Sequence, residues 1–188
     1  DKKLYPSDSI FSDKMSPLQG PAMLFFNDGL FTDADLKAIQ RLGAGTKKKS
    51  SANIGRFGLG FCTVYHVTDA PSFASGSWLS FFDPMCHFLP EASHISPGRL
   101  FDTHKNPGIF SAFHAQFEPY TRLGWKSSEF FKGTLFRLPL RTKSSDLSDH
   151  VPSVDNVLYL LDQFCHQISC STMFLKNLTQ LKVEVYNE

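Results

Sequence analysis

The chain has 188 residues, and its 19 Lys and Arg against 18 Asp and Glu give a formal net charge of +1. This length fits one domain, residues 1–188, and the 41% hydrophobic content argues against disorder. The balanced charge argues against nucleic-acid binding driven by bulk charge, and no apolar run reaches the ~20 residues that span a bilayer. We therefore expect a globular domain with no nucleic-acid partner and no membrane span.

The chain begins with an irregular, proline-containing segment, and the first regular element follows it. The apolar run 22–26 predicts a buried strand, which an Asn-Asp-Gly stretch ends. Residues 31–43 predict a helix, with Thr32 as the N-cap and Asp35 at the third helical position. The small and basic segment 44–53 that follows has no periodicity and predicts a mobile loop.

The middle of the chain predicts a hairpin and then becomes hard to interpret. A glycine cluster opens a further helix with apolar positions through Val67, and two strands then meet at the turn Gly76-Ser77. Between Met85 and Lys132 the signal weakens, with one helix expected at about 109–117.

The last part of the chain has clearer patterns. Residues 134–140 predict a strand, and Ser153 caps an amphipathic helix whose inward positions are Val157, Leu161, Phe164 and Ile168. Residues 171–178 predict another helix, and the alternation in 181–186 predicts a last strand. Because strands and helices are intermixed, we expect an α/β or α+β two-layer sandwich with helices on one sheet face.

The four cysteines are interpreted as thiols rather than as disulfides or metal ligands. No Cys-x-x-Cys pair occurs, Cys62 and Cys165 fall in apolar helical patterns, and the histidines lack metal-ligand spacing. We expect buried thiols of a reducing compartment, which favours a cytoplasmic location.

Three glycines, Gly55, Gly58 and Gly60, fall within six residues where a helix begins. Each costs roughly 1 kcal/mol relative to Ala inside a helix, so a close ligand would explain them. The N–H groups at such a helix start suit phosphate. The segment is not a Walker loop, because no Lys-Ser or Lys-Thr follows, and it is not a Rossmann fingerprint, because no strand runs directly into it. Tight turns or close packing remain the alternative explanations.

The stretch IGRFGLGFCTVYHVTD resembles the second glycine box of the gyrase, heat-shock chaperone, histidine kinase and MutL (GHKL) superfamily. The chaperone branch, of the Hsp-ninety type, is similar apart from a Gln where Arg56 stands. FTDADLKAIQRLGAGTKKK resembles the stretch from the first glycine box into the helix and lid, and KGTLFRLPL resembles the late Gly-Thr strand. With PLQGPAMLFFND, FDP and FLKNLTQLKVEV, the likeness to the Hsp-ninety-type modules of the sacsin family covers nearly the whole chain.

The resemblance implies the Bergerat ATP-binding fold, with a mixed sheet covered on one face by helices, and it assigns a nucleotide site. The backbone of Gly55, Gly58, Gly60 and Phe61 would bind the phosphates of ATP or ADP with Mg²⁺, Arg56 would touch a phosphate, and Thr134 would serve the adenine side. The family reads adenine with an Asp of an Asp-x-Gly-x-Gly pattern, but here only Asn27, Asp28 and Gly29 occupy that place. A plain turn is the alternative interpretation of these three residues. Lys47, Lys48 and Lys49 fall in the lid segment, where they screen a triphosphate or are simply solvated.

One family feature is not found. The family's catalytic Glu-x-x-x-Asn helix has no counterpart in this sequence, so we expect a fold that lacks its first helix and strand. Without the general base we expect no meaningful ATP hydrolysis by this chain alone. An unpaired sheet edge would then favour a homo-oligomer or a swapped dimer. The resemblance implies protein clients and co-chaperone domains as partners, and the alternative is a protein-interaction scaffold that has lost ATP.

Overall fold

The structure is a computed structural model that describes residues 9–40, 60–172 and 178–186. The chain divides into two compact units, Asp1–Val151 and Pro152–Glu188, and each is described by itself. The predicted glycine segment lies largely outside the described residues.

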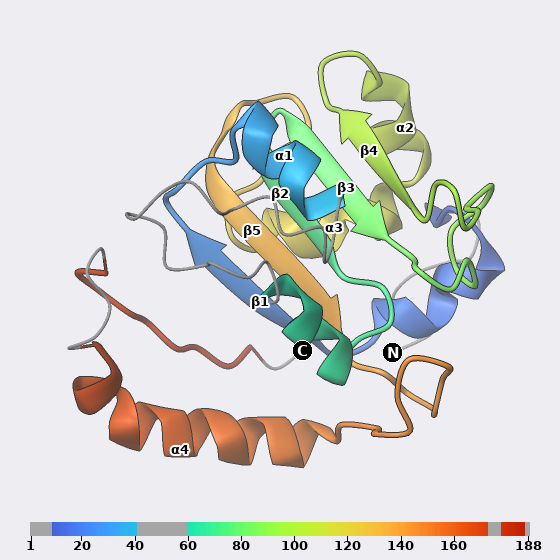
Figure 1. The fold of residues 1–188 in the computed structure, drawn as a ribbon. Helices are drawn as coiled ribbons and strands as arrows, with labels where there is room; N and C mark the ends of the chain where they lie inside the picture. The colour runs from blue at the N-terminus through green and yellow to red at the C-terminus, as the bar shows by residue number, and fades with distance from the viewer. Residues whose placement is uncertain (1–8, 41–59, 173–177, 187–188) are drawn as a thin grey trace. The chain divides into compact units, whose positions relative to one another are not determined.

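The first unit is built on one antiparallel sheet with the strand order β1-β5-β2-β3-β4 (Figure 1). Its strands are β1 (Ala22–Asn27), β2 (Ser72–Gly76), β3 (Trp78–Phe82), β4 (Gly98–Asp102) and β5 (Phe131–Pro139). The sequence predicted all of these except β4, which lies in the weakly patterned stretch. The mixed sheet implied by the resemblance is not observed, because every described pairing is antiparallel.

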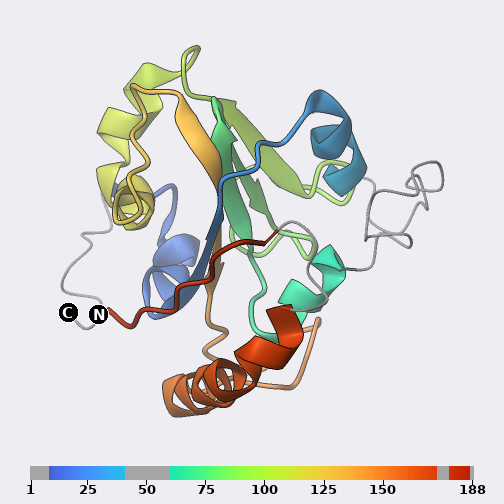
Figure 2. The ribbon, with the colours of Figure 1, turned by 90° about the vertical axis from the view of Figure 1, so that its left-hand side faces the viewer.

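Helices cover both faces of the sheet, whereas the sequence predicted helices on one face (Figure 2). One face packs against η2 (Asp13–Gln19), α2 (Pro107–Ala112) and α3 (His114–Thr121), and the other against α1 (Asp33–Gln40) and η3 (Phe61–His66). The reason is visible in β5, where Leu135 joins the first cluster and Phe136 joins the second. Apolar residues at consecutive positions of a strand point to opposite faces, so both faces need a cover.

The first strand, β1, is present as predicted, but it is not buried as predicted. β1 pairs with β5 alone among the described residues, and it forms one edge of the sheet. The side chains of Phe25 and Phe26 are 46% and 50% exposed. The strand itself is confirmed, with Ala22 to Asn27 in register with Pro139 to Thr134.

The predicted cap of α1 is confirmed. The Asp35 amide donates to Thr32 Oγ1 at 3.2 Å, and the Thr32 amide donates to Asp35 Oδ2 at 3.0 Å. This reciprocal pair satisfies N–H groups that a helix start leaves without a partner. Leu36 and Ile39, three positions apart on α1, pack in the second apolar cluster.

Two other predicted helices differ from the observed ones. The helix after the glycine cluster is present as η3, a single 3₁₀ segment. The helix expected at about 109–117 is divided into α2 and α3 at Phe113, whose φ of −118° and ψ of 48° are not helical. Phe113 contacts Phe11 edge-on at a centroid distance of 5.1 Å and packs against the first apolar cluster. Its side chain therefore contributes to the core at the point where the helix is interrupted.

The turn after β3 is organised by one carboxylate. Asp83 is fully buried, and its two oxygens accept N–H groups from His87, Phe88 and Leu89 at 3.0, 2.7 and 2.8 Å. The Asp83 amide also donates to the Pro97 carbonyl at 2.7 Å, immediately before β4 begins. Both the side chain and the backbone of Asp83 therefore hold the loop that leads to β4 to the end of β3.

The second unit contains α4 (Val154–Thr172) and the described tail 178–186. The Ser153 cap is confirmed, because the Asn156 amide donates to Ser153 Oγ at 3.1 Å. Val157 is buried, but Phe164 is 41% exposed, so its predicted inward position is wrong.

The tail also differs from its prediction. The predicted strand 181–186 is absent, because these residues form no ladder within the described chain. Alternation alone makes a strand only where a partner strand supplies hydrogen bonds. The helix predicted for 171–178 falls mostly outside the described residues, beyond the end of α4.

Three cysteines with described side chains are free and less buried than expected. Cys62 and Cys86 are half-buried, and Cys165 is exposed on α4. The expectation of buried thiols is therefore wrong for these three.

Tyr120 gives the core a measurable pH response. It is fully buried, donates to Ser72 Oγ at 2.5 Å, and burial raises its pKa to about 12, against the opposing charge of Arg137. An unfolded tyrosine titrates near 10, so above pH 10 the unfolded chain binds fewer protons than the folded one. The free energy of unfolding therefore falls with rising pH, at up to about 1.4 kcal/mol per pH unit between 10 and 12.

Urea unfolding at pH 9, 10 and 11 checks this expectation. Burial also raises the pKa of Tyr65 to about 12, so a comparison with Tyr120→Phe isolates Tyr120. Above pH 10, the free energy of unfolding of Tyr120→Phe should fall with pH less steeply than that of the unmodified chain, by about 1 kcal/mol per pH unit. Equal slopes for both chains would contradict the assignment.

Candidate functional site

Residues that the resemblance assigns to the adenine side meet at one end of the sheet. Asn27, the last residue of β1, pairs with Thr134 of β5. Thr134 is fully buried, and its hydroxyl donates to the Gly29 carbonyl oxygen at 2.7 Å. The turn after β1 is therefore fastened to β5 by the predicted threonine.

Ser75 completes this polar group and was not predicted. It pairs with Thr134 from the β2 side, and the two hydroxyl oxygens lie 2.8 Å apart. The Phe31 amide donates to Ser75 Oγ at 3.0 Å, which links the group to the residue that precedes Thr32, the N-cap of α1. No sequence signal marks Ser75, because its role follows from the burial of every residue of β2, which the structure shows.

The three residues of the first motif form a turn. Asn27 Oδ1 accepts the Gly29 amide at 3.0 Å, which is the local bond that favours Asn in turns. Asn27, Asp28 and Gly29 are all exposed. The plain-turn interpretation thus describes the observed backbone, and the amide oxygen of Asn27 is engaged within the chain.

A β-bulge brings the neighbouring backbones very close together. Ser75 pairs with Thr134 but Gly76 pairs with Phe131, so β5 has extra residues at this point. Gly133 has a φ of +151°, and a Cβ placed on it would lie 2.6 Å from the Asn27 carbonyl oxygen. Only glycine fits both the backbone angle and the space.

The predicted phosphate side is described only at its end. Gly55, Arg56 and Gly58 lie outside the described residues, as do Lys47, Lys48 and Lys49. Gly60 is the N-cap of η3, and a Cβ placed on it would meet nothing within 4 Å.

Phe61 fixes the start of η3 to the sheet face that also carries α1. Its ring lies 5.1 Å from Phe82 and 6.2 Å from Phe136, between centroids. Both rings belong to the cluster that contains Leu36 of α1. Phe61, at the described end of the glycine segment, and helix α1 therefore pack in the same apolar cluster.

Two further features bear on the partners of the chain. Within the described ranges no group of three or more His, Cys, Asp or Glu side chains is arranged to hold a metal ion. No described helix combines the length and the apolar character needed to cross a membrane.

Comparisons with known proteins identify the family of this chain. Residues 1–188 match the sacsin domain family over the full chain, and the chain belongs to that family. Human sacsin is 38% identical over 191 residues, which cover 97% of this chain. The chain spans 4% of the length of that relative.

Proposed function

We propose that this chain is a chaperone-type nucleotide-binding module with the Bergerat fold of the GHKL superfamily, and that it has lost catalysis. It would bind ATP or ADP with Mg²⁺ and act in protein folding or filament quality control within a longer cytoplasmic protein. Membership of the sacsin family and the glycine box in the sequence support this proposal.

The observation that carries the proposal is the hydrogen bond from Thr134 to Gly29. It joins two segments 105 positions apart in the sequence, and the resemblance assigns both of them to the adenine side. The anchoring of Phe61 on the α1 cluster adds the end of the phosphate segment to the same sheet face.

A second candidate function is a protein-interaction scaffold that keeps the fold without nucleotide. It is favoured by Asn27, whose amide oxygen accepts the Gly29 amide instead of remaining free for an exocyclic amine. The open edge of β1, with exposed Phe25 and Phe26, suits the addition of a strand from a second copy or from a client. Clients and co-chaperone domains would use such an edge in either case.

Calorimetric titration with ATP and ADP in Mg²⁺ separates the two functions. We expect a Kd below about 1 mM, which corresponds to about 4 kcal/mol of binding free energy. Gly58→Arg should abolish the binding, because its side chain would occupy the space of the phosphates. Gly108→Arg is the matched control, since Gly108 lies on α2 with open space around it. Absence of heat with either nucleotide, on protein shown to be folded, would favour the scaffold.

Phosphate release checks the loss of catalysis in the same samples. We expect no turnover above that of a Gly58→Arg control, because the sequence contains no Glu-x-x-x-Asn pair to activate water. Turnover by this chain alone would overturn that part of the proposal.

A further inference from the structure

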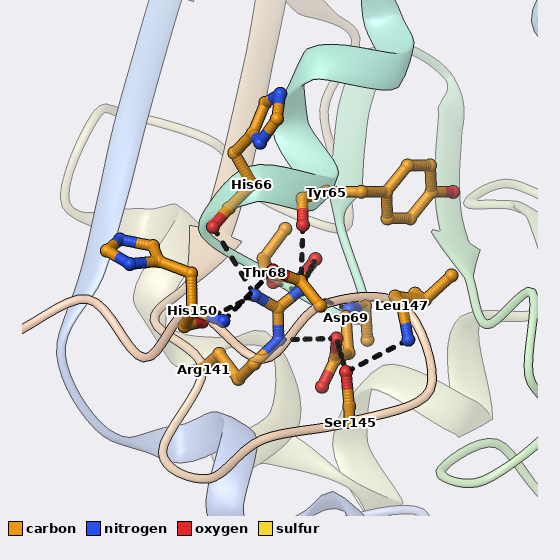
Figure 3. Close-up of polar contacts among 10 residues, drawn as sticks. Tyr65, His66, Thr68, Asp69, Arg141, Ser145, Leu147 and His150 are labelled. Carbon is orange, nitrogen blue, oxygen red and sulfur yellow. Dashed lines mark hydrogen bonds and ion pairs between the residues drawn. The ribbon is translucent and has the colours of Figure 1, made fainter.

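Arg141, the second residue after β5, donates all of its side-chain hydrogens within the chain (Figure 3). It is 3% exposed, and a guanidinium carries five N–H groups. Nε donates to Asp69 Oδ1 at 2.7 Å. The other four donate to carbonyl oxygens: Nη1 to His66 at 3.3 Å and His150 at 2.9 Å, and Nη2 to Tyr65 at 2.7 Å and Thr68 at 3.4 Å.

These acceptors belong to two segments that are distant in sequence. Tyr65 and His66 end η3, and their carbonyl groups are among those that a helix end leaves without an internal partner. The Arg141 backbone amide donates to the carbonyl of Val67, just beyond them, at 2.8 Å. His150 lies at the far end of the loop that follows Arg141, so one side chain holds this loop to the end of η3.

Asp69 extends the same group into the loop. Its Oδ1 accepts Ser145 Oγ at 2.8 Å as well as Arg141 Nε. Ser145 Oγ in turn accepts the Leu147 amide at 3.3 Å. We name Arg141, Asp69 and Ser145 the arginine clasp. A buried ion pair is costly to desolvate, and here every guanidinium hydrogen has an acceptor that offsets this cost.

The clasp matters because a short 3₁₀ segment depends on contacts with the rest of the fold. A single 3₁₀ segment is weak by itself, with poor hydrogen-bond geometry and few bonds of its own. η3 follows Gly60 directly, and the ring of Phe61 at its start packs against the sheet rings Phe82 and Phe136. Near its end, the half-buried ring of Tyr65 contacts the ring of Phe61. Phe61 holds the first turn and Arg141 holds the last.

We propose that Arg141 is a positioning residue for nucleotide binding: it holds the C-terminal end of η3, the helical segment that begins with Gly60 as its N-cap and with Phe61. This inference rests on the proposed nucleotide site and assigns a role to a residue that contacts no nucleotide itself. Lysine cannot replace it, because an ammonium has three donors at one point and cannot reach five acceptors in a plane.

Arg141→Lys, compared with Arg137→Lys, tests the proposal. Arg137 is a matched control, since it is also buried, lies on β5 and donates to a backbone carbonyl, that of Leu18, at 2.7 Å. We expect Arg141→Lys to weaken ATP binding at least tenfold, and Arg137→Lys to change it less than threefold at a temperature where both variants are folded. Equal changes in both variants would overturn the proposal, since destabilisation of the fold would then explain them.

Hydrogen exchange gives a second readout that needs no nucleotide. The Val67 and Thr68 amides both donate to the Val64 carbonyl at 3.1 Å, and they report on the end of η3. We expect Arg141→Lys to lower their protection more than that of the β2–β3 hairpin, and Arg137→Lys to leave this ratio unchanged. A uniform loss of protection in Arg141→Lys would overturn the positioning of η3.

Ser145→Ala keeps the test valid if Arg141→Lys does not fold. It removes the hydrogen bond from Ser145 to Asp69 and the one that Ser145 Oγ accepts from the Leu147 amide, but it leaves the Arg141–Asp69 pair in place. We therefore expect a twofold to fivefold loss of ATP affinity with normal folding. Unchanged affinity in this variant would count against the proposal. If the unmodified chain binds no ATP, the proposed function fails, and the exchange experiment alone then decides whether Arg141 fixes η3.

Discussion

Replacing Asp83 by alanine should lower the free energy of unfolding by about 3–5 kcal/mol, among the largest effects expected for any single substitution in this chain. The carboxylate accepts three backbone N–H groups, from His87, Phe88 and Leu89, and the substitution leaves all three without their acceptor. A buried amide that loses its partner costs about 1–3 kcal/mol. Of the three residues, Leu89 is buried, Phe88 is half-buried and His87 is exposed. Thermal unfolding should show a Tm about 10 °C lower or more.

Two further variants show whether the loss of stability comes from the carboxylate of Asp83. Asp83→Asn keeps one acceptor oxygen, so its loss should fall between that of Asp83→Ala and zero. Asp149→Ala removes an exposed aspartate and should change stability by less than about 0.5 kcal/mol. A Tm for Asp83→Ala close to that of Asp149→Ala would show that the loop before β4 does not depend on this carboxylate.

Gly133→Ala should be the second severe substitution, with a loss of about 3 kcal/mol or more. The new Cβ would lie 2.6 Å from the Asn27 carbonyl oxygen and 2.6 Å from Phe26 Cε2. Because the nearest atom is backbone of a paired strand, relief requires β1 to move away from β5. The φ of +151° adds strain for any residue with a side chain.

Urea unfolding measures this loss, and Gly108→Ala provides the contrast. Gly108 lies within α2, and a Cβ there meets nothing within 4 Å. Alanine should be neutral or more stable by up to about 1 kcal/mol at this position, because it favours a helix. Similar stabilities of Gly133→Ala and Gly108→Ala would mean that β1 is free to move at the bulge.

The elements that could be predicted from the sequence are those specified by neighbouring residues. The cap of α1 depends on Thr32 and Asp35, three positions apart, and the β2–β3 hairpin depends on Gly76, whose φ of +58° permits the tight turn. The covering of both sheet faces was not predicted, because it depends on which distant helices reach Leu135 and Phe136. Strand β4 was missed for a related reason, since the buried carboxylate of Asp83 and the pairing with β3 define it more than its own pattern does.

The candidate site divides in the same way. Motif resemblance placed Thr134 and Gly29 on the adenine side, and the structure brings them into contact. Ser75 and Arg141 were missed, because a serine in a strand and an arginine after one have no local signature. Their roles arise only from acceptors contributed by other segments. At 181–186 the sequence predicted an element that is absent, because the strand-like alternation has no described partner strand.

The distribution of the two tryptophans across the sheet has a practical consequence. Trp125 is buried among Phe110, Phe117 and Tyr120 in one apolar cluster, while Trp78 borders the other. Intrinsic fluorescence therefore has one emitter for each layer of the molecule. A chain carrying Trp78→Phe would report the α2–α3 side alone, so the melting of the two layers can be followed separately in one instrument.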